Sequence, residues 1–381
     1  MLRLVIQHCV LFRLPPLPFS VDPIVFSSDD ESAWRRLRSN AALSCRASLV
    51  SLIFPKGSHV DCRFLPQSIR RLSFNSGSFL VGDPLLPPSL THLALGCRYN
   101  KPLPDLPNLV HLSLGDHFNQ SLPCLPNLIH LSLGFRYNQP LPIFSNLTHL
   151  SLGYCFNQSL PNLPNLTHLS LGYFFNQHLP DLPNLTHLVL GEHFILPLPS
   201  LPNLIHLSLG CHFIQYLPNL PNLTHLSLGK QFYLPLPIFP NLTHLSLGCC
   251  FDQPLPSLPN LTHLSLGDHF NQPLSTLPNL THLSLSYYYD QPLPDLHNLT
   301  HLTLGYYHNQ PLPDLPNLTH LFLGDHFNQP LSTLPNLTHL TLGFEFNQPF
   351  VDFFNLTHLY LGYCFNQPLP NLPPSLVVTR L

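Results

Sequence analysis

Asn317-Leu318-Thr319-His320-Leu321-Phe322-Leu323-Gly324 is one copy of a phrase that returns every 19 residues along this chain. Its leucines follow the spacing L-x-x-L-x-L. The alternation over residues 321–323 predicts a short strand with leucines on one face and with His320 and Phe322 on the other. Gly324 closes the phrase, which we interpret as a tight turn whose backbone angles other residues avoid.

The phrase occurs in 15 units without insertion or deletion, and glycine closes 14 of them, with Ser286 as the exception. One unit cannot bury its own leucines, so the units must stack on one another. Phe327 is expected to stack on Phe346 and Phe365 inside the coils. The return path over 330–335 carries too much proline for a helix and predicts an extended wall. The predicted fold class is mainly β: a parallel β-solenoid of leucine-rich-repeat-like coils with a small N-terminal helical or irregular cap.

We divide the chain into an N-terminal cap, two degenerate repeats, the regular array and a truncated terminal repeat, at residues 1–47, 48–88, 89–373 and 374–381. Within the cap, Ser28-Asp29-Asp30-Glu31 has the spacing of a helix capping box. Apolar residues then recur at helical intervals up to Cys45, which predicts one amphipathic helix at about 29–45. Such a cap covers the exposed apolar end of the first coil.

The phrase Leu-Thr-His-Leu-x-Leu-Gly-x-x-Phe-Asn-Gln-Pro-Leu resembles the FNIP repeat, a relative of the leucine-rich repeat found in amoebae and in giant viruses that infect them. It is plainest in residues 261–274, 318–331 and 356–369, although the period of this chain is shorter than that family's usual one. The resemblance implies a protein-interaction array. It also implies an N-terminal F-box in some members, which recruits a ubiquitin ligase through a Skp-type adaptor. Residues 1–47 are an F-box candidate, but proline follows Leu14-Pro15 where the early helices of an F-box should run.

Composition excludes several functional classes. Charged residues make up only 9% of the chain and the net charge is −3, which argues against nucleic-acid binding through a basic patch. The chain contains no run of 18 apolar residues, so no membrane-spanning helix is predicted. The ten cysteines form no C-x-x-C pair, and the Asn-Leu-Thr phrases read as asparagine ladders rather than glycosylation sites. We therefore expect free thiols in a reducing compartment and an intracellular, cytoplasmic location.

Each of the 15 regular units carries histidine at the fourth position of the phrase, from His92 to His358. One interpretation is a metal-binding face or an acid sensor; the other is a half-exposed strand position with no separate role. A row supplies only pairs of ligands, whereas a zinc site needs tetrahedral ligands that converge. We therefore predict no metal site and no cofactor. No motif of a phosphate loop, a nucleophile elbow or a zinc protease is present either, so we predict that the protein is not an enzyme.

Binding is best sought where the units differ, which is at the two positions after each glycine and in three central units. The central units replace the Phe-Asn-Gln phrase with apolar residues, which form either an exposed docking stripe or, if they point inward, a dry variant of an asparagine ladder. The candidate partner-binding residues are Tyr173, Phe174, Ile195, Ile214, Tyr233, Tyr287, Tyr288, Tyr306 and Tyr307.

Two functions follow from this pattern. The first is a non-enzymatic protein–protein interaction scaffold that presents its strand face and its variable post-glycine positions to a protein partner, as in the target-binding subunit of a ubiquitin ligase. The alternative is a structural spacer or self-associating rod without a specific partner. The two differ in whether the substitutions between units gather into coherent surface patches.

Overall fold

The computed structural model describes residues 86–369 and 376–380 together with the shorter stretches 4–6, 24–26, 51–54, 59–61, 65, 67–74 and 79–81. No helix occurs in these residues. The helix predicted for 29–45 lies outside them, as does most of the F-box candidate. The chain divides into two compact units, residues 1–185 with 189–191 and residues 186–188 with 192–381.

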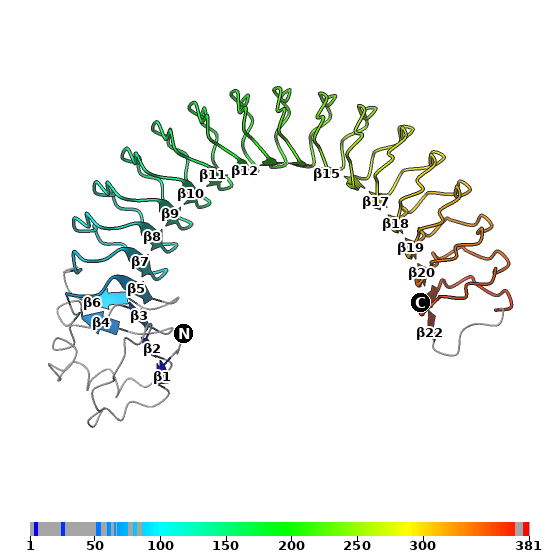
Figure 1. Cartoon of the computed structure of the whole chain (residues 1–381), viewed down its shortest axis with the longest axis horizontal. Coiled ribbons are helices and arrows are strands. Elements are labelled where there is room, and N and C mark those ends of the chain that lie inside the picture. Colours follow the sequence, from blue (N-terminus) through cyan, green and yellow to red (C-terminus); the bar gives the residue numbers. More distant parts are fainter. Residues whose placement is uncertain are drawn as a thin grey trace. The chain divides into compact units, whose positions relative to one another are not determined.

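In the first unit, each regular coil contributes one strand to a parallel sheet, and like residues pair with like: His149 aligns with His130 and His168. Figure 1 shows these strands side by side. The strands are β7 (His92–Leu95), β8 (His111–Leu114), β9 (His130–Leu133), β10 (His149–Leu152) and β11 (His168–Leu171).

Strands also form at the N-terminal end of this unit. β1 (Leu4–Ile6), β2 (Ile24–Phe26), β3 (Ser51–Phe54) and β5 (Arg71–Phe74) pair in parallel and continue the sheet to β7. A separate two-stranded parallel sheet joins β4 (His59–Asp61) and β6 (Phe79–Val81). The sheet therefore begins within the segment that the sequence predicts as a cap, and both degenerate repeats contribute strands to it.

The second unit repeats the same register, with His225 aligned to His206 and His244. Its strands are β13 (His206–Leu209), β14 (His225–Leu228), β15 (His244–Leu247), β16 (His263–Leu266), β17 (His282–Leu285), β18 (His301–Thr303), β19 (His320–Phe322), β20 (His339–Thr341), β21 (His358–Leu361) and β22 (Val377–Arg380). The same phrase forms β12 (His187–Leu190). The parallel solenoid predicted from the repeat is confirmed.

The core of each coil consists of the phrase leucines, one aromatic ring and apolar residues of the return path, such as Leu258. Leu261, Leu264 and Leu266 are at most 2% exposed, as the alternation of the strand requires. The Phe327 ring lies 6.2 Å from that of Phe346, which is 6.2 Å from Phe365, so the predicted interior stack is confirmed. Adjacent coils thus bury continuous columns of leucine and phenylalanine that a single coil could not bury.

One member of the aromatic column in the described residues is a histidine. His308 takes the place of phenylalanine and lies between Tyr289 and Phe327, at centroid distances of 5.8 and 6.2 Å. Its side chain is completely buried, and neither ring nitrogen has a hydrogen-bond partner among the described residues. Burial lowers the pKa of His308, and the nearby Asp290 opposes that shift. The sequence analysis placed phenylalanine in this stack but did not identify His308 as one of its members.

The glycines that close the phrase in successive coils are needed for a reason that differs from our prediction. Twelve of the phrase glycines, among them Gly248 and Gly267, do not adopt the left-handed backbone that the tight-turn interpretation requires, so that explanation is wrong. A Cβ added at Gly248 would instead overlap the carbonyl of Gly229 in the preceding coil. Glycine is therefore needed because the backbones of neighbouring coils approach each other too closely for any side chain.

Two asparagine ladders join the coils. The first uses the phrase asparagine: the Asn260 side-chain amide donates to the carbonyl of Pro240 at 2.8 Å. The second uses the Phe-Asn-Gln phrase, where the Asn157 side-chain oxygen accepts from the backbone of Asn176 at 2.9 Å and from Gln177 at 3.2 Å. These bonds satisfy backbone groups in the turns, as predicted, because no helix or sheet partner reaches them.

Candidate functional site

The two variable positions that follow each glycine form a surface edge that we call the post-glycine edge. The backbone N–H of the second position donates to the carbonyl of the first position in the preceding coil, as Tyr288 does to Asp268 and Tyr307 to Tyr287, both at 3.0 Å. This repeated bond arranges the variable side chains in two parallel columns. The residues that differ between units therefore share one edge within each unit.

In the first unit, aromatic residues gather on this edge. The rings of Phe135 and Tyr154 stack at 4.5 Å, and those of Tyr154 and Tyr173 at 4.6 Å. Phe174, which is 42% exposed, meets Tyr173 edge to face at 5.1 Å. The structure thus joins the predicted pair Tyr173 and Phe174 to Phe135 and Tyr154, which the sequence analysis did not single out although they lie in register with Tyr173 at intervals of 19 residues.

In the second unit, Tyr287, Tyr288, Tyr306 and Tyr307 form a continuous surface that we call the tyrosine tile. Tyr287 stacks on Tyr306 at 4.9 Å, and Tyr288 stacks on Tyr307 at 5.6 Å. Within each coil the two rings are nearly perpendicular, at 80°. All four residues were predicted as partner-binding candidates, and the structure brings them together.

The tile is accessible to solvent. Tyr287, Tyr288 and Tyr307 are between 40% and 46% exposed. Partial desolvation and the neighbouring tyrosine hydroxyls raise the pKa of Tyr287. Aromatic rings with a polar hydroxyl are the side chains most often found at the centre of protein interfaces.

The three apolar residues of the central units, Ile195, Ile214 and Tyr233, form what we call the Ile–Tyr stripe. They are 43%, 39% and 51% exposed, so the alternative in which this position points inward is wrong. The asparagine ladder is interrupted here, and Gln215 donates to the backbone carbonyl of Ile195 at 3.1 Å instead of to a side chain. The stripe is an exposed apolar surface on the second unit, separate in sequence from the tyrosine tile.

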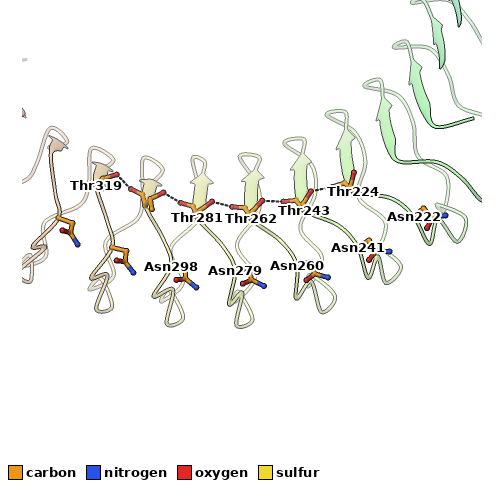
Figure 2. Close-up of a pocket in the computed structure, with 13 residues that line it drawn as sticks. Asn222, Thr224, Asn241, Thr243, Asn260, Thr262, Asn279, Thr281, Asn298 and Thr319 are labelled. Atoms are coloured by element: carbon orange, nitrogen blue, oxygen red, sulfur yellow. Dashed lines mark hydrogen bonds between the residues drawn. The ribbon is translucent and has the colours of Figure 1, made fainter. Parts of the chain in front are cut away.

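A long groove that the sequence analysis did not anticipate runs along the second unit. It has a volume of about 1130 Å³ and is lined alternately by the asparagines and threonines of successive phrases, from Asn222 to Asn336. Figure 2 shows the threonine row joined by hydrogen bonds and the asparagine row beside it. Because every coil contributes the same two residues, this Asn–Thr groove is uniform and offers no position that distinguishes one coil from another.

The phrase histidines stack on one another in a histidine column on the outer strand face of each unit. Ring centroids of neighbours such as His244 and His263 lie 4.2 Å apart, at interplanar angles near 10°. The ring of each is half-buried, because its neighbours cover both faces. Burial is the main cause that lowers the pKa of His244 and His263, and other histidines of the column lower both further: His206 and His282 for His244, and His244 and His282 for His263.

The hydrogen bonds of the column fix the tautomer of these rings. The Thr262 hydroxyl donates to the carbonyl of Thr243 at 3.0 Å and lies 2.9 Å from Nδ1 of His263. A hydroxyl has one hydrogen, so Nδ1 must be the donor in the second bond. In the neutral ring Nε2 is then unprotonated. The same pair of bonds recurs from Thr243 to Thr357.

The described part of the chain contains no group of three or more histidine, cysteine or acidic side chains placed to hold a metal ion. The parallel rings of the histidine column present their Nε2 atoms side by side rather than toward one point. In the same residues, no helix has the length and apolar character needed to cross a membrane. Seven described cysteines are free thiols, of which Cys249 and Cys250 are close together, with sulfur atoms 3.9 Å apart.

The repeat of this chain is similar to repeats in known proteins. A family model described as the FNIP repeat matches residues 251–288. Among solved structures, the chain is similar to CroV588, a giant-virus protein described as a novel circular LRR protein structure. The TM-score is 0.68 at 26% identity, and the alignment covers 90% of this chain and 67% of that one. No curated protein sequence matches the chain significantly.

Proposed function

We propose that the chain, a repeat protein of the FNIP and leucine-rich-repeat-like type, is a non-enzymatic scaffold that binds a protein partner through its post-glycine edge. The observation that carries this proposal is the gathering of exposed aromatic side chains on that edge. A solenoid needs glycine, leucine and phenylalanine at fixed positions, but nothing in its stacking requires Tyr287, Tyr288, Tyr306 or Tyr307. Side chains that the frame does not need are the ones available for binding.

The solenoid type supports a scaffold rather than a catalyst. Stacked repeats present extended surfaces, and repeat proteins commonly use these for binding. An active site needs one constellation of unlike groups with perturbed acidity. The histidine column and the Asn–Thr groove instead repeat one environment many times. We propose an intracellular location on the basis of the exposed thiols Cys250 and Cys364.

The Ile–Tyr stripe lies outside the post-glycine edge and is a second candidate docking surface of the scaffold, which a separate variant tests. Replacing Ile195, Ile214 and Tyr233 with asparagine restores the residue type of the ladder found in the other coils, so folding should be retained. We expect the variant to lose captured proteins when wild-type and variant chains are used as bait and quantified by mass spectrometry. The matched control replaces the exposed Ile238, on the return path, with asparagine. Equal capture by all three chains would reject the stripe as a docking surface.

The finer proposal is that the partner complex is a ubiquitin ligase in which this array binds the target. It rests on the resemblance of the repeat and requires residues 1–47 to bind a Skp-type adaptor. A pull-down of the full chain with a purified adaptor, compared with a chain lacking residues 1–47, tests this step. Retention of the adaptor only by the full chain would support the ligase role, and no retention by either would remove it without affecting the scaffold.

A further inference from the structure

We propose that the tyrosine tile binds a basic, arginine-containing segment of a protein partner. This inference rests on the proposed scaffold function and specifies the chemistry of its partner. It depends on the charges around the tile, which differ from those around the aromatic cluster of the first unit.

The tile is bracketed by carboxylates. The first column of the post-glycine edge reads Asp268, Tyr287, Tyr306 and Asp325 in consecutive coils, and the backbone bonds that align the column are continuous across all four. Both aspartates are exposed. Each end of the tyrosine stack therefore has a carboxylate in the position that a further ring would occupy.

No fixed positive charge opposes these carboxylates in the sequence around them. Residues 231–379 contain no lysine or arginine, whereas they contain seven aspartates and one glutamate. The cation that precedes the tile in the first column is Lys230, two coils before Asp268. His326 beside the tile is already paired through Nδ1 with Glu345 at 3.0 Å. The tile thus combines aromatic rings and carboxylates that have no cationic side chain of their own.

A cation of the partner fits both features at once. The negative faces of tyrosine rings attract a cation, and an exposed carboxylate adds an ion pair. Arginine suits this surface better than lysine, because its planar guanidinium stacks on a ring and can donate two parallel hydrogen bonds to a carboxylate. The side chains of Tyr287 and Asp268, one coil apart, provide that pair of contacts, and so do those of Tyr306 and Asp325.

The first unit supplies an internal comparison. Its cluster of Phe135, Tyr154, Tyr173 and Phe174 has similar ring geometry, with stacking distances of 4.5 and 4.6 Å. Its first column is also flanked in the sequence by carboxylates, Asp116 and Glu192, but two features differ from the tile. Arg136 directly follows Phe135 and places a fixed positive charge in the second column, and the Glu192 carboxylate already accepts a hydrogen bond from the backbone N–H of Cys211 at 2.7 Å. An arginine-rich segment should therefore select the tile over this cluster.

The test measures binding of the full chain to short fluorescein-labelled peptides by fluorescence anisotropy. One peptide alternates arginine with serine, and matched peptides replace arginine with lysine, glutamine or glutamate. We expect the arginine peptide to bind most tightly, with an affinity that falls as salt is added. Equal binding of the arginine and glutamine peptides would overturn the proposal.

Variants locate the site. Replacing Asp268 and Asp325 with asparagine preserves shape, and we expect it to weaken binding of the arginine peptide by about threefold to tenfold. Replacing Tyr287 and Tyr306 with leucine should weaken it by a similar factor. The control variant Tyr154→Leu, in the first unit, should leave the affinity unchanged. Unchanged binding in both tile variants, or equal weakening in the control, would contradict the assignment.

The outcome separates this inference from the proposed function. If the tile variants lose captured protein partners but the arginine peptide does not bind, the scaffold stands and the basic-segment proposal fails. If the arginine peptide binds at the tile but no partner capture depends on the post-glycine edge, the peptide chemistry is correct and the scaffold proposal fails.

Discussion

At the scale of single residues, the repeat is most informative where one coil departs from it. Ser286 replaces the glycine of every other regular coil, and His308 replaces the phenylalanine or tyrosine found at that register in the others. Each lies next to the tyrosine tile in the sequence. The structure shows what each column requires: an apolar ring in the interior, and the absence of a side chain where coils approach each other. Departures from these requirements should therefore have measurable costs.

Replacing His308 with phenylalanine should stabilise the protein. The histidine buries two ring nitrogens without partners in the described structure, and an unsatisfied buried polar group costs about 1–3 kcal/mol. Phenylalanine fills the same place in the stack between Tyr289 and Phe327. We expect a higher midpoint of thermal unfolding by circular dichroism. The reciprocal control Phe327→His should lower it, and a His308→Phe variant less stable than the wild type would contradict this interpretation.

Replacing Gly248 with alanine should destabilise the protein because the added methyl group overlaps the backbone of the preceding coil. If backbone conformation were the only reason for glycine here, the loss of stability would be smaller, because Gly248 does not adopt a left-handed φ that alanine would avoid. The control is Ser286→Gly, which removes a side chain from the same column. We expect a lowered unfolding midpoint for the first variant and no loss for the second; a fully stable Gly248→Ala protein would be incompatible with the close approach.

At the scale of the element, the histidine column makes the stability of the strands depend on pH. Burial and neighbouring histidines hold the pKa of residues such as His225, His263 and His301 below the ordinary value of 6.5. The unfolded chain then binds more protons than the folded one once the pH falls below that value. The contribution of the column is therefore fully present above about pH 6.5 and is lost as the pH falls toward the lowered folded values.

We accordingly expect the unfolding midpoint to fall when the pH is lowered from about 7.5 to about 5. A chain with His225, His244 and His263 replaced by glutamine should show a smaller fall, because three residues whose pKa is lowered by folding are then absent from the column. The His308→Phe chain separates the interior histidine from the column. A midpoint that stays constant over this range in the wild-type chain would refute the repulsion along the column.

The strand, the outward histidines, the interior phenylalanine stack and the asparagine ladders were all predictable from sequence. Each depends on the spacing of residues within one unit, and the fixed 19-residue period aligns the equivalent residues of successive coils in a column. The role of glycine was not predictable, because the close approach of Gly229 and Gly248 belongs to two coils rather than to one turn. The exposure of Ile195 and Ile214 also depends on how the turn is oriented, which alternation within one strand does not determine.

At the scale of the whole molecule, a uniform frame carries a variable edge. Stacking explains most of the composition: leucine and phenylalanine in the core, proline on the return path, and asparagine and threonine in the ladders. The period alone could not predict the tyrosine tile, since its ring contacts depend on which side chains neighbouring coils place in the two columns. The side chains of the tyrosine tile, which stacking does not require, lie on the post-glycine edge, and we place the function there.

The most direct test of that claim compares an edge variant with a frame variant as bait for protein partners. The edge variant replaces Tyr287, Tyr288, Tyr306 and Tyr307 with serine, and the frame variant replaces Asn279 in the Asn–Thr groove with alanine. With folding of each chain confirmed by circular dichroism, we predict that the edge variant loses the partners that the wild-type chain captures and that the frame variant keeps them. Partners retained by the edge variant and lost by the frame variant would contradict the account.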